Sequence, residues 1–202
     1  MIKKTRSKVV GLILSFLVLT VGFVVFMPFL FMFAQSMRLP SDAYRLPPDW
    51  FPTTLDWTNY KTLFTSDLPM LNMLGNSALV TFSIIILRLI VAVLAAYAIA
   101  KIRYRGSNTV MVGFLASMML PIQATIIPLY IIMSNLGLVN TRMSLIIIGI
   151  FDSFCIFMLK QSMATIPDSI VESAKIDGAG HMRICWQIVV PMIKSSLATM
   201  VI

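Results

Sequence analysis

The sequence has 202 residues, of which 58% are hydrophobic and only 12% are charged, with a formal net charge of +8. Its mean hydropathy of +0.91 is far above that of an ordinary soluble domain and predicts an all-α protein that crosses a membrane several times. The basic residues lie beside apolar stretches, so the positive charge does not indicate nucleic-acid binding.

Side chains suited to catalysis or metal binding are sparse. Cys155 and Cys185 are far apart with no C-x-x-C pair, and His181 is the single histidine, so we expect neither a disulfide nor a metal site. The sequence contains no G-x-x-x-x-G-K, H-E-x-x-H or G-x-S-x-G motif. It therefore predicts that the chain is not an enzyme and binds no cofactor, and that any ATP is bound by another chain.

The first predicted span is the uncharged run at 9–37, which follows four basic residues between Lys3 and Lys8. A membrane-crossing helix needs about 20 apolar residues. The apolar region of a signal peptide has only about 7 to 15 residues, so an uncleaved signal anchor is favoured. Pro28 should kink or loosen this helix.

Residues 38–75 are predicted to form an extracytoplasmic loop. Five prolines oppose long helices there. The aromatic residues, among them Trp50, Trp57, Tyr44 and Tyr60, suit the headgroup level of a bilayer. Their simplest role is to anchor the loop.

The second predicted span, 76–100, carries Arg88 near its middle. An arginine at that depth costs about 2.5 to 3.5 kcal/mol or more, so it should face the bundle interior, water or an acidic partner. Lys101, Arg103 and Arg105 then indicate a cytoplasmic turn.

The third predicted span, 109–134, contains Pro121 and Pro128 together with Gln123 and Thr125. This pattern is typical of a broken helix, whose freed backbone groups must be buried in protein or line a watery cavity. The segment is a candidate wall of a translocation path. A kinked packing helix, with Gln123 and Thr125 bonded to neighbours, is the alternative.

The fourth predicted span, 143–162, has Asp152 and Ser153 at its centre. A carboxylate inside a membrane suggests a functional site. Asp152 is either an acceptor for a substrate hydroxyl or the counter-ion of Arg88. Asp152 and Ser153 therefore join Gln123 and Thr125 as candidate residues of a substrate path.

A polar loop at 166–191 follows these spans. Ser169 and Glu172 have the S-x-x-E spacing of a capping box, which predicts the start of a short helix. Gly178 and Gly180 should end that helix and allow a sharp turn. A second helix should then run from His181 to Pro191.

The same loop resembles a known signature, E-A-A-x-x-x-G-x(9)-I-x-L-P, which ABC-importer permease subunits carry. The matching positions are Glu172, Ser173, Ala174, Gly178, Ile188, Val190 and Pro191. Ser173 replaces an alanine and Val190 replaces a leucine. The D-G-A sequence of Asp177, Gly178 and Ala179 is similar to the carbohydrate branch, the maltose-permease-like subunits.

Three further stretches are similar to the same family: LDWTNYKTLF at 55–64, AAYAIAKIRYRG at 95–106 and PIQATIIPLY at 121–130. The resemblance implies the transmembrane domain of a type I ABC importer, which would move a sugar or oligosaccharide. It would work with a homologous sister permease, two cytoplasmic ATPase subunits that hold ATP and Mg, an extracytoplasmic solute-binding protein, and membrane lipids.

In the family the loop at 166–191 is a coupling helix that docks in a cleft of the ATPase. The resemblance carries this role over to Glu172, Ser173, Ala174, Asp177, Gly178 and Ala179. Small Ala174 would allow close approach to the partner, and Glu172 would meet a basic group there or merely close the capping box. Gly178 would set the angle to the next helix.

The distribution of basic residues predicts orientation. Eleven fall in segments assigned to the inside and four, Arg38, Arg45, Lys61 and Arg142, in segments assigned to the outside. The amino terminus and the coupling loop should therefore be cytoplasmic in a prokaryotic inner membrane. Residues 195–202 should begin a fifth span, and the family pattern would add two spans after the loop, so the chain looks truncated after four.

Two alternative functions explain fewer features. An ion- or proton-coupled secondary transporter would use Arg88 and Asp152 but would not need the glycine-hinged coupling loop. A non-transporting membrane scaffold would suit a four-span chain but would not require polar groups in mid-membrane.

Overall fold

The structure is a computed structural model that describes residues 2–39, 54–65, 70–102 and 104–201, with the side chains of the first helix described from Gly11 onward. Every described regular element is a helix, which confirms the all-α prediction. The chain divides into two compact units, Met1–Asn72 and Met73–Ile202. Most of the proline-rich loop, including Tyr44 and Trp50, lies outside the described residues, as does Arg103.

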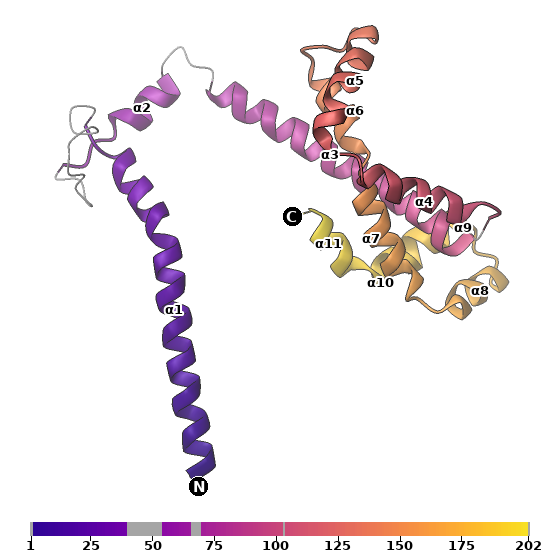
Figure 1. Ribbon diagram of the computed structural model, residues 1–202, viewed down its shortest axis with the longest axis horizontal. Coiled ribbons are helices and arrows are strands. Elements are labelled where there is room, and N and C mark those ends of the chain that lie inside the picture. Colours follow the sequence, from indigo (N-terminus) through magenta and orange to yellow (C-terminus); the bar gives the residue numbers. More distant parts are fainter. Residues whose placement is uncertain (1, 40–53, 66–69, 103, 202) are drawn as a thin grey trace. The chain divides into compact units, whose positions relative to one another are not determined.

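The first unit contains α1 (Ile2–Ser36) and α2 (Thr58–Thr65), shown in Figure 1. Helix α1 continues through Pro28. The amide of Asn59 donates to the carbonyls of Ser36 (3.1 Å) and Arg38 (2.8 Å), which ties α2 to the end of α1. Both the hydroxyl and the N–H of Thr58 donate to Asp56, and these bonds hold the pKa of the Asp56 carboxyl below its usual value.

The second unit begins within the first turn of α3 (Met70–Tyr97), which continues as a π-helical stretch, η1 (Ala98–Ile102). The following helices are α4 (Ser107–Met118), α5 (Ile122–Asn135), α6 (Arg142–Ile150) and α7 (Ser153–Ala164). The loop at 166–191 supplies α8 (Asp168–Ile176), α9 (His181–Ile184), the π-helical η2 (Cys185–Val189) and the start of α10 (Val190–Met192), and α11 (Lys194–Val201) follows.

The core of this unit forms where η1, α4, α7 and η2 meet. Helix α7 contacts α4, η1 and α11. Its side chains Leu159 and Met163 are fully buried, as are Ile184 and Val189 from the segment after the coupling helix. In Figure 1, α8 lies at the end of the unit away from α5 and α6. The loop at 166–191 is thus packed on the core through its own helical segments.

Two of the expected spans are interrupted. Helices α4 and α5 cover the predicted third span, but they meet at 103° because the chain leaves the helix at 119–121, where Pro121 is the N-cap of α5. Proline lacks an N–H and disfavours helical geometry in the residue before it. The second interruption separates α6 from α7 at Phe151 and Asp152.

Three helical stretches among the described residues are long and apolar enough to cross a membrane: Gly11–Ser36, Met70–Ile102 and Arg142–Ala164. The number is five if α4 with α5, and α9 to α10 with α11, each count as one bent span.

Candidate functional site

Helix α8, which the sequence predicts to be a coupling helix, begins differently from the prediction. Its N-cap is Pro167, no side chain caps it, and Asp168 is its first residue, so Ser169 lies inside the helix. The capping box predicted from Ser169 and Glu172 is therefore wrong. Pro167 sets the entry to the helix, and the acidic Asp168 in the first turn complements the helix dipole.

The carboxyl end of α8 is a Schellman motif. Gly178 has φ +80°, its N–H donates to Lys175 O at 3.0 Å, and the N–H of Ala179 donates to Ala174 O at 2.9 Å. Gly180 has φ −72° and ψ 159° and is the N-cap of α9. Of the two glycines that the sequence singled out, Gly178 makes the left-handed turn and Gly180 starts the next helix in an extended conformation.

The two faces of α8 have different surroundings. Val171 and Ala174 are buried against this chain's own core. Glu172, Ser173 and Asp177 are exposed, and Ile176 is 86% exposed. The inward position of Ala174 differs from the expected close contact with a partner, because this small side chain lets α8 approach its own core.

Lys101 makes a contact that the sequence did not indicate. Its side chain is only 2% exposed, and Nζ donates to Ile166 O at 2.6 Å and to Asp168 Oδ1 at 2.9 Å. The sequence places Lys101 among the basic residues of a cytoplasmic turn, but the helix continues through it as η1. Its buried ammonium lies directly beneath the start of α8.

A second contact joins the helix before the turn to the far side of the loop. The Tyr97 hydroxyl lies 3.2 Å from His181 Nδ1, and the two rings meet edge to face. Tyr97 is buried at the end of α3, and His181 is the first residue of α9. Residues of α3 and η1 therefore contact the chain before and after the exposed face of α8.

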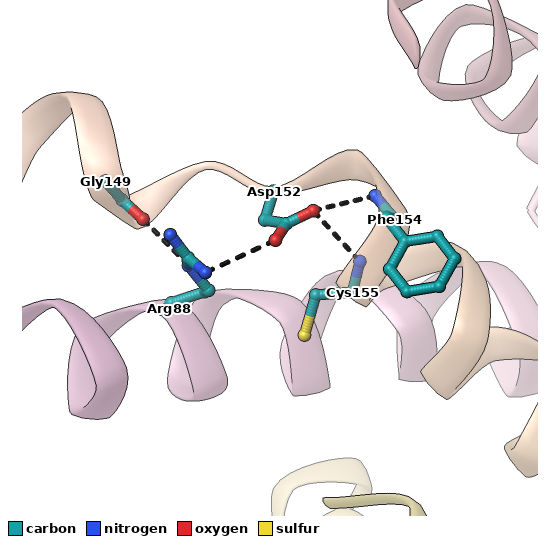
Figure 2. Close-up of polar contacts among 5 residues, drawn as sticks. All are labelled: Arg88, Gly149, Asp152, Phe154 and Cys155. Atoms are coloured by element: carbon teal, nitrogen blue, oxygen red, sulfur yellow. Dashed lines mark hydrogen bonds and ion pairs between the residues drawn. The ribbon is translucent and has the colours of Figure 1, made fainter. Parts of the chain in front are cut away.

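Arg88 and Asp152, predicted as a possible ion pair, are brought together (Figure 2). Arg88 Nη1 lies 3.3 Å from Asp152 Oδ2, and Arg88 Nε donates to Gly149 O at 2.8 Å. Asp152 Oδ1 accepts the N–H groups of Phe154 and Cys155 at 2.9 and 3.2 Å, so Asp152 is the N-cap of α7. The pair thus satisfies backbone groups that the interruption between α6 and α7 leaves free.

Gly149 permits this arrangement. A Cβ at Gly149 would lie 2.7 to 3.0 Å from three side-chain atoms of Ile84 on α3, which is closer than side chains pack. The absence of a side chain therefore brings the Gly149 carbonyl within reach of Arg88.

The other candidate substrate residues are less closely grouped. Ser153 shares a 2.7 Å hydrogen bond with Ser117 of α4, next to Asp152. Thr125 donates to Ile122 O within α5, and Gln123 is exposed on the same helix. The structure thus joins Ser153 to the helix break and places Gln123 and Thr125 on a separate helix.

A polar cavity that the sequence did not indicate lies between the start of α3 and the start of α6. Its volume is about 600 Å³. The lining residues are Asn76, Ser77, Val80, Thr81, Asn140, Thr141, Arg142, Ser144 and Leu145. Residues with amide, hydroxyl and guanidinium groups, from two helices, line the cavity, and none of them belongs to the predicted substrate path.

Comparison with known proteins assigns the family. The model of the binding-protein-dependent transport system inner membrane component matches residues 88–202, more than half of the chain. The chain belongs to this permease family. The match includes both the coupling loop and the Arg88–Asp152 pair.

Individual permeases are also similar to the chain. It is 34% identical over 128 residues to the sn-glycerol-3-phosphate transport system permease protein UgpE of Yersinia pestis bv. Antiqua (strain Antiqua), a match that covers 63% of this chain and 46% of the relative. It is 30% identical to the inner membrane ABC transporter permease protein YcjP of Escherichia coli (strain K12), over 96% of this chain and 70% of the relative. The arabinooligosaccharides permease AraQ of Halalkalibacterium halodurans is 27% identical, over 99% of this chain and 72% of the relative.

The fold of this permease matches a solved structure. A bacterial ABC transporter involved in the import of the acidic polysaccharide alginate aligns with a TM-score of 0.83 at 24% identity, over 96% of this chain and 68% of that chain. The two proteins therefore share a fold over nearly the whole of this chain.

The Schellman geometry makes Gly178 sensitive to substitution. Gly178→Val should destabilise the turn by about 1–2 kcal/mol, because a β-branched side chain opposes the left-handed conformation. Hydrogen exchange at the Ala179 amide should then speed up about tenfold. Gly180→Val is the matched control, since its extended backbone accepts valine and no atom lies within 4 Å of an added Cβ. Equal exchange in the two variants would contradict this account of the turn.

The Arg88–Asp152 pair predicts non-additive substitutions. Arg88→Gln and Asp152→Asn should each destabilise the inserted chain, and the double variant should be less destabilised than either, with a coupling energy of about 1–2 kcal/mol. The free energy of unfolding in mixed micelles is measured for all three variants. Combining Arg88→Gln with Lys175→Ala, an exposed position on α8, should give additive losses. Additivity in the Arg88–Asp152 cycle would show that the two side chains act independently.

Proposed function

We propose that this chain is the membrane permease subunit of an ATP-driven ABC importer for a carbohydrate, and that α8 docks on a cytoplasmic ATPase. The observation that carries the proposal is Ile176. It is 86% exposed in the polar loop at 166–191. Exposed apolar side chains are expected where a helix faces lipid, but α8 is a short amphipathic helix in a segment that the positive-inside rule, applied to the whole chain, assigns to the cytoplasm.

A docked partner would bury Ile176. Removing a side chain of this size from water contributes about 1.5–3 kcal/mol. Around it, Glu172 and Asp177 offer carboxylates to a basic surface, and Ser173 offers a hydroxyl. The family membership supports an ATPase as this partner. The ATPase would hold ATP and Mg, and a sister permease and an extracytoplasmic solute-binding protein would complete the importer.

The proposed solute class rests on the relatives and on the polar cavity. AraQ is named for arabinooligosaccharides, MdxG of Bacillus subtilis (strain 168) for maltodextrin, and UgpE for sn-glycerol-3-phosphate. All three are solutes rich in hydroxyl groups. The amide and hydroxyl groups that line the 600 Å³ cavity are suited to hydrogen bonds with such solutes, and Arg142 would favour an anionic one.

In this proposal, closure of the ATPases moves α8 and so changes which side of the membrane a central site faces. The amino terminus and α8 are cytoplasmic in a prokaryotic inner membrane. A proton-coupled transporter is less well supported, because Asp152 already accepts two backbone N–H groups and pairs with Arg88. Those contacts account for a half-buried carboxylate at this position without a transported proton.

Ile176→Ser tests the docking face. The full-length gene product, expressed with the other proteins of its locus, should co-purify with a cytoplasmic ATPase in mild detergent, and the variant should retain at least tenfold less, because the apolar contact is lost. Ile127→Ser is the matched control. Ile127 is 69% exposed on α5 and distant from α8 in the sequence.

Two outcomes would contradict the proposal. Wild-type protein that captures no ATPase in several mild detergents would remove the importer function. Capture that Ile176→Ser leaves unchanged would remove α8 as the docking element. If wild-type protein captures an ATPase and Ile176→Ser does not, uptake assays with oligosaccharides and with glycerol phosphate would separate the two solute classes.

A further inference from the structure

We propose that Lys101 is the positioning residue that fastens the start of the coupling helix α8 to the end of α3 and η1, so that α8 and α3 move as one body. This inference rests on the proposed function, because it names the contact through which movement of α8 would reach the membrane helices.

The burial of Lys101 is the first observation. The whole residue is 7% exposed and its side chain 2%. Removing an ammonium group from water costs several kcal/mol unless hydrogen-bond acceptors replace the water. Two acceptors do so: Ile166 O at 2.6 Å and Asp168 Oδ1 at 2.9 Å. If α8 moved away from η1, this buried charge would lose both of them.

The position of the acceptors is the second observation. Ile166 and Asp168 lie on either side of Pro167, the N-cap of α8. Pro167 fixes its own φ angle, so the two acceptors are held by a rigid piece of backbone. Lys101 therefore binds the residues at the start of α8. The exposed face of α8, which carries Glu172, Ser173 and Ile176, stays accessible to a partner.

Helix α3 extends the contact into the membrane. Arg88 lies thirteen residues before Lys101 on the same helical rod, about 20 Å away at 1.5 Å per residue. Arg88 holds Gly149 and Asp152 at the start of α7, and Lys101 holds Ile166 and Asp168 after its end. Helix α7 has twelve residues, about 18 Å, which matches the separation of the two cations. Helix α7 is thus joined at both of its ends to the rod formed by α3 and η1, and α8 is attached to the joined pair.

Lys101→Met tests this role because methionine keeps the apolar length and removes the donor. In the complete complex, the variant should still capture the ATPase through the exposed face of α8. The ratio of solute-stimulated to basal ATP hydrolysis should fall at least tenfold, and amide exchange in the first turn of α8 should accelerate. Lys194→Met is the matched control, since Lys194 is exposed at the start of α11.

Two conservative variants separate positioning from folding. Lys101→Arg keeps a cation with several donors and should restore most of the stimulation, whereas Asp168→Asn keeps an acceptor without its charge and should lose about two- to fivefold. If Lys101→Met is not recovered from the membrane, Asp168→Asn and Lys101→Arg decide the question. If the ratio of solute-stimulated to basal ATP hydrolysis in Asp168→Asn equals that of the wild type, the proposal is overturned.

The failures of the two proposals can be told apart. A wild-type complex that captures no ATPase contradicts the proposed function. A wild-type complex that captures and couples normally, with a Lys101→Met variant that couples equally well, contradicts only the role of Lys101. Loss of capture in Lys101→Met at normal membrane yield would also overturn it, because the docking face itself would then depend on Lys101.

Discussion

Two cations on one helical rod hold the second unit together, and each is satisfied in the same way. Arg88 binds the carbonyl of Gly149 and the carboxylate of Asp152, and Lys101 binds the carbonyl of Ile166 and the carboxylate of Asp168. In both cases the carbonyl lies just before a helix start, and the carboxylate caps that helix or lies in its first turn. A cation there neutralises the carboxylate and satisfies a backbone acceptor that the helix interruption leaves free.

This arrangement explains how the chain tolerates irregular backbone between apolar helices. Backbone groups at a helix break are costly in a low-dielectric environment unless protein groups satisfy them. At the break between α6 and α7 the N–H groups of Phe154 and Cys155 are bound by Asp152, and the Gly149 carbonyl by Arg88. The ion pair therefore has a structural role whether or not a solute reaches it.

Local sequence was enough to predict the features that depend on one residue type. Gly178 was expected to turn the chain because glycine adopts positive φ, and Pro121 to interrupt a helix because it lacks an N–H. The sequence does not predict the buried contact of Lys101, because a lysine at the end of an apolar run has the same local sequence whether its side chain is solvated or buried. The inward face of Ala174 and the polar cavity likewise depend on helix packing, which the periodicity of a single helix does not determine.

The shortness of α8 gives these attachments their importance. A helix of nine residues is unstable by itself in water, since it has too few hydrogen bonds to offset the cost of nucleation. Its order comes from Asp168 bound to Lys101 at one end, the left-handed turn at Gly178 at the other, and Val171 and Ala174 buried between them. The exposed face of α8 is thereby held rigid by contacts on its opposite face. In the proposed function, residues that lie away from the docking face therefore control how movement of α8 reaches α3 and α7.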